Sequence, residues 1–277
     1  MKFSILTPSH RQFPWLRRCI RSVADQPGVE IEHLIQDTGH DPDLATWARQ
    51  QSTVHLAAEP DTGMYHALNK ALSRATGDII GLLNSDEQYL PGTLAKVARA
   101  FAENPEADLV AGDYLVVDPE QQLLAFRKVT PLREATILTD HLYAFTCALF
   151  IRRSVFADVG PFDESFRSVA DADWVARALH RGHRAVLLPE YLATFTWTGE
   201  NLSAQAISRE EELRLRAKAP PVARLAAPLL RTWRHVERWM AGGYHSRPIR
   251  YEVYLHPDSL TRTQITCEHP SYRYPCG

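Results

Sequence analysis

Short apolar runs alternate with stretches of helical periodicity through the first 113 residues, and this alternation restricts the fold more than any other feature. The apolar runs, which predict strands, occupy 3–7, 31–35, 54–57, 79–83 and 109–111, and the helical stretches begin near 14, 44, 64 and 91. Strands that alternate with helices indicate a mainly parallel sheet with helices on its faces. The sequence therefore predicts an α/β fold.

The stretch from Glu59 to Asp86 carries the clearest chemistry. A helix ends before Gly77, and the buried run 79–83 that follows stops abruptly at Asn84-Ser85-Asp86-Glu87. Parallel strands end at one rim, so Asp86 should lie near Asp37, at the rim where open α/β sheets bind ligands. Asp86 suits a hard divalent cation, and Asp37 suits a nucleotide base or ribose. Both residues are also ordinary turn formers, and both interpretations stay open.

A second acidic pair, Asp171 and Asp173, stands near the start of a later helix. Acidic residues in a first helical turn are favourable in themselves, so helix capping and catalysis are both consistent with this pattern. The surrounding sequence predicts a hairpin over 114–128, strands at 148–151 and 186–188, and a separate edge segment at 192–197.

The C-terminal region mixes apolar residues and arginines from Leu213 to Trp239, and its prolines predict several short helices. One interpretation is a helical pair packed on the domain with its arginines in solvent. The alternative is a peripheral contact with a membrane surface, which would suit a lipid-linked acceptor. In the tail, 244–277, the alternating residues 251–255 could pair as a strand.

Composition excludes several classes of protein. The net charge of -2 gives no pull toward nucleic acid. Four cysteines without a C-x-x-C pair argue against a zinc site and favour a reducing cytosol. No apolar run approaches the roughly 20 residues that span a bilayer, and the N-terminus lacks a signal-peptide core, so we expect a cytoplasmic protein. The dinucleotide, P-loop and G-x-S-x-G motifs are missing from the sequence.

Four segments resemble family 2 glycosyltransferases of the GT-A fold, particularly the bacterial members that build exopolysaccharides. These segments are SILTPSHRQFPWLRRCIRSVADQ, IEHLIQDTG, EPDTGMYHALNKALSRATGDIIGLLNSDE, and FIRRSVFADVGPFDESF followed by ADADWVARAL. They lie between about Phe3 and Leu202, and their order and spacing match the family. The resemblance implies an inverting transferase that moves a sugar from a nucleotide-diphosphate sugar, most commonly a UDP-sugar, to a sugar or lipid-linked acceptor.

The resemblance also implies roles for individual residues. Asp86 matches the acid that coordinates Mg²⁺ or Mn²⁺ beside the donor diphosphate. Asp171 matches the general base, with Asp173 as the other candidate. The positions that it places at the donor site are Thr7, Pro8, Asp37, Asn69, Lys70, Asn84 and Ser85.

The chain departs from the family pattern at three places. Asn84 occupies the first acidic position of the D-x-D motif, so direct ligation of a metal rests on Asp86, with Glu87 as an assistant through water. Ala170 precedes Asp171 where the family has glutamate, so the choice of base stays open. The final seventy or so residues match nothing in the family, and we predict a GT-A domain over 1–204 and a helical and irregular extension over 205–277.

Two other functions remain as alternatives. A sugar nucleotidyltransferase would carry a glycine-rich loop after the first strand, and the sequence after Pro8 has no glycine there. A non-catalytic protein that binds nucleotide sugars is favoured only by the incomplete acidic motif.

Overall fold

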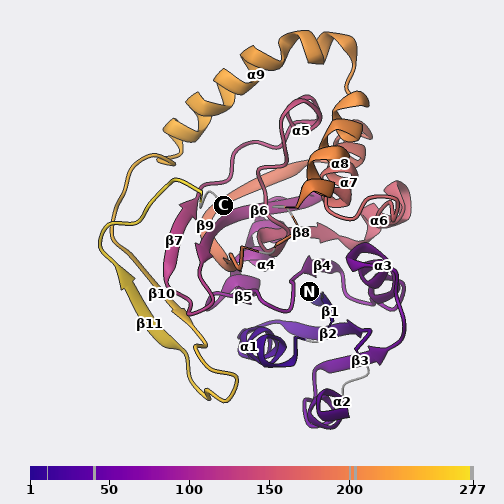
Figure 1. Cartoon of the computed structure of the whole chain (residues 1–277), viewed down its shortest axis with the longest axis vertical. Helices are drawn as coiled ribbons and strands as arrows, with labels where there is room; N and C mark the ends of the chain where they lie inside the picture. Colours follow the sequence, from indigo (N-terminus) through magenta and orange to yellow (C-terminus); the bar gives the residue numbers. More distant parts are fainter. Residues whose placement is uncertain (11, 40–41, 200, 203–204, 275–277) are drawn as a thin grey trace.

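The computed structural model describes residues 1–10, 12–39, 42–199, 201–202 and 205–274, and shows a curled sheet with helices around it (Figure 1). The strands are β1 (Lys2–Ser9), β2 (Glu30–Asp37), β3 (Val54–Ala58), β4 (Ile79–Leu82), β5 (Gln88–Tyr89), β6 (Leu109–Val117), β7 (Leu123–Arg127), β8 (Leu149–Arg152), β9 (Ala185–Thr196), β10 (Ile249–Val253) and β11 (Thr263–Cys267). The helices are α1 (Phe13–Ala24), α2 (Pro42–Ala48), α3 (Met64–Ser73), α4 (Thr93–Glu103), α5 (Glu134–Thr139), α6 (Arg153–Val159), α7 (Ala170–His180), α8 (Ala206–Ala217) and α9 (Pro221–Met240), and Thr146–Ala148 form a 3₁₀ turn.

Within the described residues, nine strands form one sheet in the order β3-β2-β1-β4-β8-β6-β9-β5, with β7 paired to β6. The first four strands are parallel neighbours, and β6 and β9 are parallel as well. β8 runs antiparallel between β4 and β6. The predicted α/β sheet flanked by helices is confirmed, and its parallel half is the part that the alternation of strands and helices predicted.

Successive residues of β1 enter two different cores, as the two-residue period of a strand requires. Ile5 belongs to a cluster with Phe101 of α4. Leu6 belongs to the cluster on the other face, with Leu68 of α3 and Trp174 of α7. The sheet is therefore covered on both faces, and its strand ends are the places left for a site.

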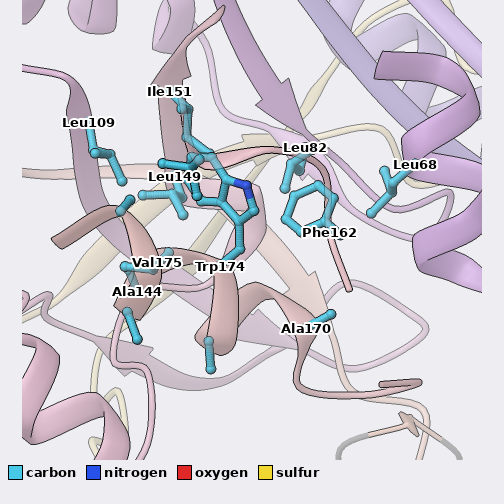
Figure 2. Packing of buried hydrophobic residues seen from close by; sticks show 14 of the residues in the cluster. Leu68, Leu82, Leu109, Ala144, Leu149, Ile151, Phe162, Ala170, Trp174 and Val175 are labelled. Carbon is cyan, nitrogen blue, oxygen red and sulfur yellow. The ribbon is translucent and has the colours of Figure 1, made fainter. Parts of the chain in front are cut away.

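Trp174 fixes α7 against the sheet. Its side chain is fully buried and lies among Leu149, Phe162 and their neighbours (Figure 2). The indole Nε1 donates a hydrogen bond to the carbonyl of Gly160 at 2.8 Å. Asp171 lies one turn earlier on the same helix, so this packing also sets the position of Asp171.

Two expectations about the elements are wrong. The segments 186–188 and 192–197 are not separate strands, because β9 pairs with β6 from Ala185 to Thr196 with shifts of register in between. Pro220 and Pro221 do separate α8 from α9, but Pro228 does not end a helix, since it lies inside the 20-residue helix α9. Pro228 is exposed, so the carbonyl that loses its backbone partner there can be satisfied by water.

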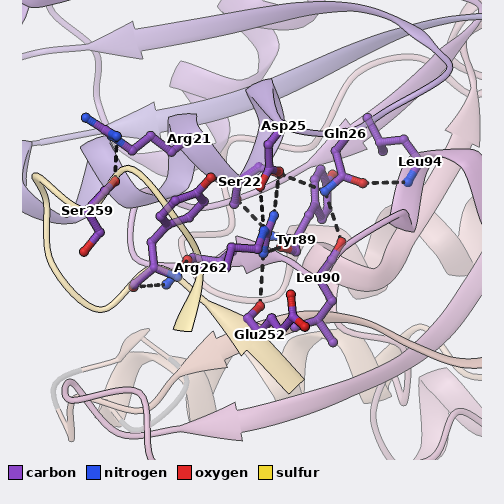
Figure 3. A network of polar contacts seen from close by, with 12 residues as sticks. Arg21, Ser22, Asp25, Gln26, Tyr89, Leu90, Leu94, Glu252, Ser259 and Arg262 are labelled. Atoms are coloured by element: carbon purple, nitrogen blue, oxygen red, sulfur yellow. Dashed lines mark hydrogen bonds and ion pairs between the residues drawn. The ribbon is translucent and has the colours of Figure 1, made fainter. Parts of the chain in front are cut away.

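Hydrogen bonds and an ion pair hold the C-terminal hairpin β10–β11 against the N-terminal part of the chain (Figure 3). The Arg262 guanidinium donates to both carboxylate oxygens of Asp25, each at 2.6 Å, and to the carbonyl of Tyr89 at 2.8 Å. Arg21 of α1 donates to the carbonyl of Ser259 at 2.6 Å. The division at 204 falls outside the described residues, and the two-domain description stays a prediction.

Candidate active site

A cavity of about 1390 Å³ lies where β1, β2 and β4 end. The end of β1 with the residue after it, the residue after β2 and the loop after β4 contribute to its wall Pro8, Ser9, His10, Thr38, Asn84, Ser85 and Asp86. Parallel neighbours end at the same edge, which is why residues so far apart in the chain meet here. Of the residues singled out from the sequence, Pro8, Asn84, Ser85, Asp86 and Asp171 line this cavity.

Glu87 shapes the loop that carries Asp86. Its fully buried carboxylate accepts hydrogen bonds from the backbone nitrogen of Asn84 at 2.7 Å and from the side-chain amide of Asn84 at 3.1 Å. Thr196 of β9 donates to the carbonyl of Asp86 at 2.5 Å. Glu87 is thus occupied behind the wall, and Asp86 is the carboxylate that this loop presents to the cavity.

Burial makes a negative charge on the neighbouring carboxyls of Asp86 and Glu87 unfavourable. Burial raises the pKa of the Asp86 carboxyl, although the nearby Arg18 guanidinium opposes the shift. Burial and the charge of Asp86 raise the pKa of the Glu87 carboxyl. A cation bound at Asp86 would offset the cost of burying the charged form of this carboxylate.

Asp171 reaches the cavity from the first turn of α7. Its Oδ1 accepts a hydrogen bond from the Tyr65 hydroxyl of α3 at 3.0 Å and one from the backbone nitrogen of Ala172 at 2.9 Å. Burial raises the pKa of the Asp171 carboxyl, and these two hydrogen bonds partly oppose that effect. A carboxylate with a raised pKa on a cavity wall is suited to accept a proton.

Asp173 lies two residues farther along α7 and points elsewhere. Its side chain is buried, with Oδ1 2.6 Å from Lys218 Nζ and Oδ2 2.8 Å from Arg177 Nε. Two residues turn an α-helix by about 200°, which explains why the neighbouring acids face different surroundings. Asp173 links α7 to the segment after α8, and it is not among the cavity-lining residues.

Thr7 and Asp37 lie behind the cavity wall. The Thr7 hydroxyl donates to the carbonyl of Leu83 at 2.7 Å and lies 2.8 Å from His33 Nε2, so it links β1 to β2 and to the residue after β4. Asp37 is buried, and its carboxylate accepts a hydrogen bond from the backbone nitrogen of Gly39 at 2.8 Å. Asp37 directly precedes Thr38, which does line the cavity.

Asn69 and Lys70 of α3 hold loops that border the cavity. Asn69 pairs with the backbone of Phe162, donating at 2.9 Å and accepting at 3.0 Å. Lys70 donates to the carbonyl of Pro60 at 2.8 Å and pairs with Glu59 at 3.2 Å. Their contacts position α3 and the loop before it, and neither residue is among those that line the cavity.

Sequence reasoning missed Tyr65 and an aromatic part of the wall. Tyr65 precedes Asn69 by one helical turn, so helical spacing within the segment could have pointed to it. The aromatic part comprises Tyr114, Tyr143, Phe145, Phe195, Trp197 and Tyr274. Its rings pack against one another, with centroids 4.3 Å apart for Phe145 and Phe195 and 5.2 Å apart for Trp197 and Tyr274. These residues come from distant segments, which no local pattern connects.

The donor atoms around Asp86 fit a metal that is shared with a substrate. Among the described residues, no group of three or more His, Cys, Asp or Glu side chains could enclose an ion. Mg²⁺ is commonly held by one or two carboxylates together with substrate phosphates and water. One cavity-facing carboxylate in a polar loop meets that requirement, whereas a site built of protein ligands alone does not fit.

Comparison with known proteins agrees with this geometry. A family model, described as glycosyl transferase family 2, matches residues 4–160, which include most of β1, all of β4 and the Asp86 loop. The chain belongs to glycosyl transferase family 2. This family 2 chain is 27% identical to a PGL/p-HBAD biosynthesis glycosyltransferase of Mycobacterium tuberculosis over 243 residues. The aligned region covers 83% of this chain and 90% of the relative.

Glycosyltransferase AglE of Haloferax volcanii is 26% identical over 193 residues, which are 65% of this chain and 62% of that relative. Among solved structures, S. aureus TarS 1-349 in complex with UDP-GlcNAc aligns with a TM-score of 0.61 at 20% identity, over 78% of this chain and 64% of that one. The chain thus spans less than two thirds of either protein. The mannosyltransferase PcManGT from Pyrobaculum calidifontis, in complex with GDP-Man and Mn2+, aligns with a TM-score of 0.60 at 18% identity, over 86% and 71% of the two chains. These structural similarities show that the fold is GT-A.

Proposed function

We propose that the protein is an inverting glycosyltransferase that moves a sugar from a nucleotide-diphosphate sugar to an acceptor hydroxyl. The observation that carries this proposal is that Asp86 and Asp171 line one cavity of a family 2 fold. The polar end at Pro8, Thr38 and Asp86 would bind the donor. The aromatic end, with its large apolar surfaces, would bind the acceptor.

In this proposal, Asp171 takes the proton of the acceptor hydroxyl as that oxygen bonds to the anomeric carbon. The bond between the anomeric carbon and the diphosphate oxygen breaks, and the electron pair leaves with the diphosphate. Attack from the face opposite the leaving group inverts the anomeric centre. A divalent cation, Mg²⁺ or Mn²⁺, held by Asp86 and the donor would supply Lewis-acid stabilisation of the leaving diphosphate. Tyr65 holds the Asp171 carboxylate in place through its hydrogen bond.

Substitution of the two acids of α7 tests the assignment of the base to Asp171 rather than Asp173. We expect Asp171→Asn to lower kcat by about 10²- to 10⁴-fold with donor affinity kept, because a general base is lost. Asp173→Asn should keep kcat but lower the free energy of unfolding by about 1–3 kcal/mol, because the buried side chain at position 173 loses the charge that pairs with Lys218 and Arg177. Urea unfolding and steady-state kinetics measure both effects. Near-normal transfer by Asp171→Asn at saturating substrates would remove it from this role.

Asp86→Ala tests the metal part of the proposal. We expect donor binding to the parent protein to tighten with added Mn²⁺, and we expect this dependence to disappear in Asp86→Ala, since no other carboxylate of the loop faces the cavity. Isothermal titration with UDP, with and without a chelator, measures it. Chelator-independent binding that also survives Asp86→Ala would contradict the metal role.

We propose a UDP-sugar as the donor and a sugar or a lipid-linked molecule as the acceptor. The TarS complexes with UDP and UDP-GlcNAc support a UDP-sugar as the donor, and the PcManGT complex makes a GDP-sugar the alternative.

We propose that the protein acts in the cytoplasm, in the synthesis of a polysaccharide or glycoconjugate. We also propose that it contacts the inner face of a membrane to reach a lipid-linked acceptor. In the described part of the chain, every helix is too short or too polar to cross a bilayer. Release of free nucleoside diphosphate from a panel of donors would distinguish an enzyme from a non-catalytic nucleotide-sugar-binding protein.

A further inference from the structure

Helix α9 is turned with its polar side toward the protein. Arg234 and Arg238 are only 7% and 8% exposed, whereas Leu225 and Leu229 are 84% and 75% exposed. A surface helix of a soluble protein normally places its apolar side on the core and its charges in water. α9 reverses this arrangement.

The exposed apolar residues of α9 form one continuous stripe, which we call the outer stripe. It consists of Val222, Leu225, Leu229, Trp233, Val236, Trp239 and Met240, all of them exposed. Apart from Trp239, these residues follow each other at intervals of three or four, the spacing of a single helical face. In Figure 1, α9 runs along the upper left edge of the molecule, outside α5 and β7.

The polar side of α9 fixes this orientation. Glu237 forms a bidentate ion pair with Arg133, with N–O distances of 2.6 and 2.8 Å. The Arg234 guanidinium lies 4.0 Å from the ring centroid of Tyr143 and 3.4 Å from the carboxylate of Asp140. Rotating the outer stripe inward would break these contacts. Asp140 and Tyr143 also line the cavity, so α9 supports the cavity wall from behind.

We propose that the outer stripe lies on an anionic lipid bilayer, at the level of the headgroups. α9 carries four arginines, of which Arg234 and Arg238 are buried against the protein and Arg224 and Arg231 are exposed. Arg231 is exposed but lies 4.0 Å from the carboxylate of Asp140, so the exposed Arg224 is the arginine of α9 that is left to contact lipid phosphates. A helix with tryptophans and leucines on one face and arginines on another is typical of an interfacial helix. Binding of α9 to a bilayer would bring the proposed transferase to a lipid-linked acceptor. Only this link to the acceptor rests on the proposed function.

A second copy of the chain fits the outer stripe less well. A 20-residue helix is about 30 Å long, and a stripe about 10 Å wide therefore offers about 300 Å². A standard interface buries about 800 Å² on each partner. An anionic bilayer would also complement the exposed Arg224 of α9, whereas the same helix of a second copy would bring a like charge.

Flotation of the full chain with lipid vesicles tests the proposal. We expect the protein to float with vesicles of phosphatidylcholine and phosphatidylglycerol, and less with phosphatidylcholine alone. Leu225→Glu/Leu229→Glu should lower the vesicle-bound fraction by about tenfold or more, since charge replaces buried apolar area. The matched control is Leu260→Glu, at a leucine that is 82% exposed outside α9 and should behave like the parent. Arg224→Glu should weaken binding to the anionic vesicles only.

Two further measurements separate the possible outcomes. The emission of Trp233 and Trp239 should shift to the blue when anionic vesicles are added, and Trp233→Phe/Trp239→Phe should remove that shift. The inactive Asp171→Asn protein should float like the parent, so failed catalysis and failed lipid binding are distinguishable. The proposal is overturned if Leu225→Glu/Leu229→Glu floats normally, if the parent stays in the soluble fraction, or if the double change instead abolishes a dimer seen by sedimentation without lipid.

Discussion

At the scale of single residues, the chemistry depends on which atoms of each acid are already occupied. Both carboxylate oxygens of Asp173 are held by cations, while Asp171 keeps one oxygen outside its hydrogen bonds with Tyr65 and Ala172. The same distinction separates Asp86 from the buried Glu87, whose oxygens accept two hydrogen bonds from Asn84. In each pair, the acid whose carboxylate is less engaged by the protein is the one that faces the cavity.

Tyr65→Phe tests the link between Tyr65 and Asp171. The Tyr65 hydrogen bond lowers the pKa of Asp171 against the larger effect of burial, so its loss should raise that pKa further. A base works only when deprotonated, and kcat therefore falls as the pH drops below the pKa of Asp171. We expect the acidic limb of the pH–kcat profile to move to higher pH in Tyr65→Phe, with kcat at high pH changed little. An unmoved acidic limb would show that another group titrates there.

At the scale of elements, Glu32 joins β2 to β1 and to the turn before β4. Its carboxylate accepts hydrogen bonds from Thr76 at 2.6 and 2.7 Å and from the backbone of Gly77 at 3.2 Å, and it pairs with Lys2 at 2.9 Å. Gly77 is required there, because a Cβ atom would lie 2.7 Å from the backbone nitrogen of Ser4. These contacts secure the end of the parallel sheet opposite to the cavity.

Stability should depend on pH through Glu32. Burial alone would raise its pKa, but the hydrogen bonds from Ser4 and Thr76 and the Lys2 ammonium outweigh burial and lower the pKa to about 2. The stabilisation is therefore complete above the unfolded pKa of about 4.3 and is lost as the pH falls toward 2. We expect Glu32→Gln to lower the free energy of unfolding by about 2 kcal/mol at pH 7. In urea unfolding, the difference from the parent should shrink between pH 5 and 2, and a constant difference would argue against this linkage.

At the scale of the whole molecule, the C-terminal region is attached at two separate places. α8 and the residues after it reach α7 through Lys218 and Asp173, and Leu215 joins the core cluster of Trp174. The hairpin β10–β11 reaches α1 through Arg262 and Asp25. α9 lies between these attachments in the chain, which leaves its outer stripe exposed while its ends are fixed.

A double-mutant cycle at Arg262 and Asp25 tests how firmly the hairpin is held. Arg262→Ala should lower the free energy of unfolding by about 2–3 kcal/mol, less than for a fully buried ion pair because Asp25 is partly exposed. Asp25→Ala/Arg262→Ala should cost less than the sum of the two single changes, since each removes the partner of the other. Urea unfolding provides the four values, and additive losses would mean that the pair is not coupled.

The sequence by itself determined the α/β fold, the rim of strand ends and the acids placed there, because hydrophobic period and strand order are local properties. Its glycosyltransferase resemblance is confirmed at the level of family and fold. The tertiary structure alone decided that Asp171 faces the cavity while Asp173 faces Lys218, and that Tyr65 is the neighbour of Asp171. It also decided that α9 continues through Pro228 and turns its arginines inward. The physical reason is that side-chain partners come from segments far apart in the chain, and packing rather than local pattern selects among them.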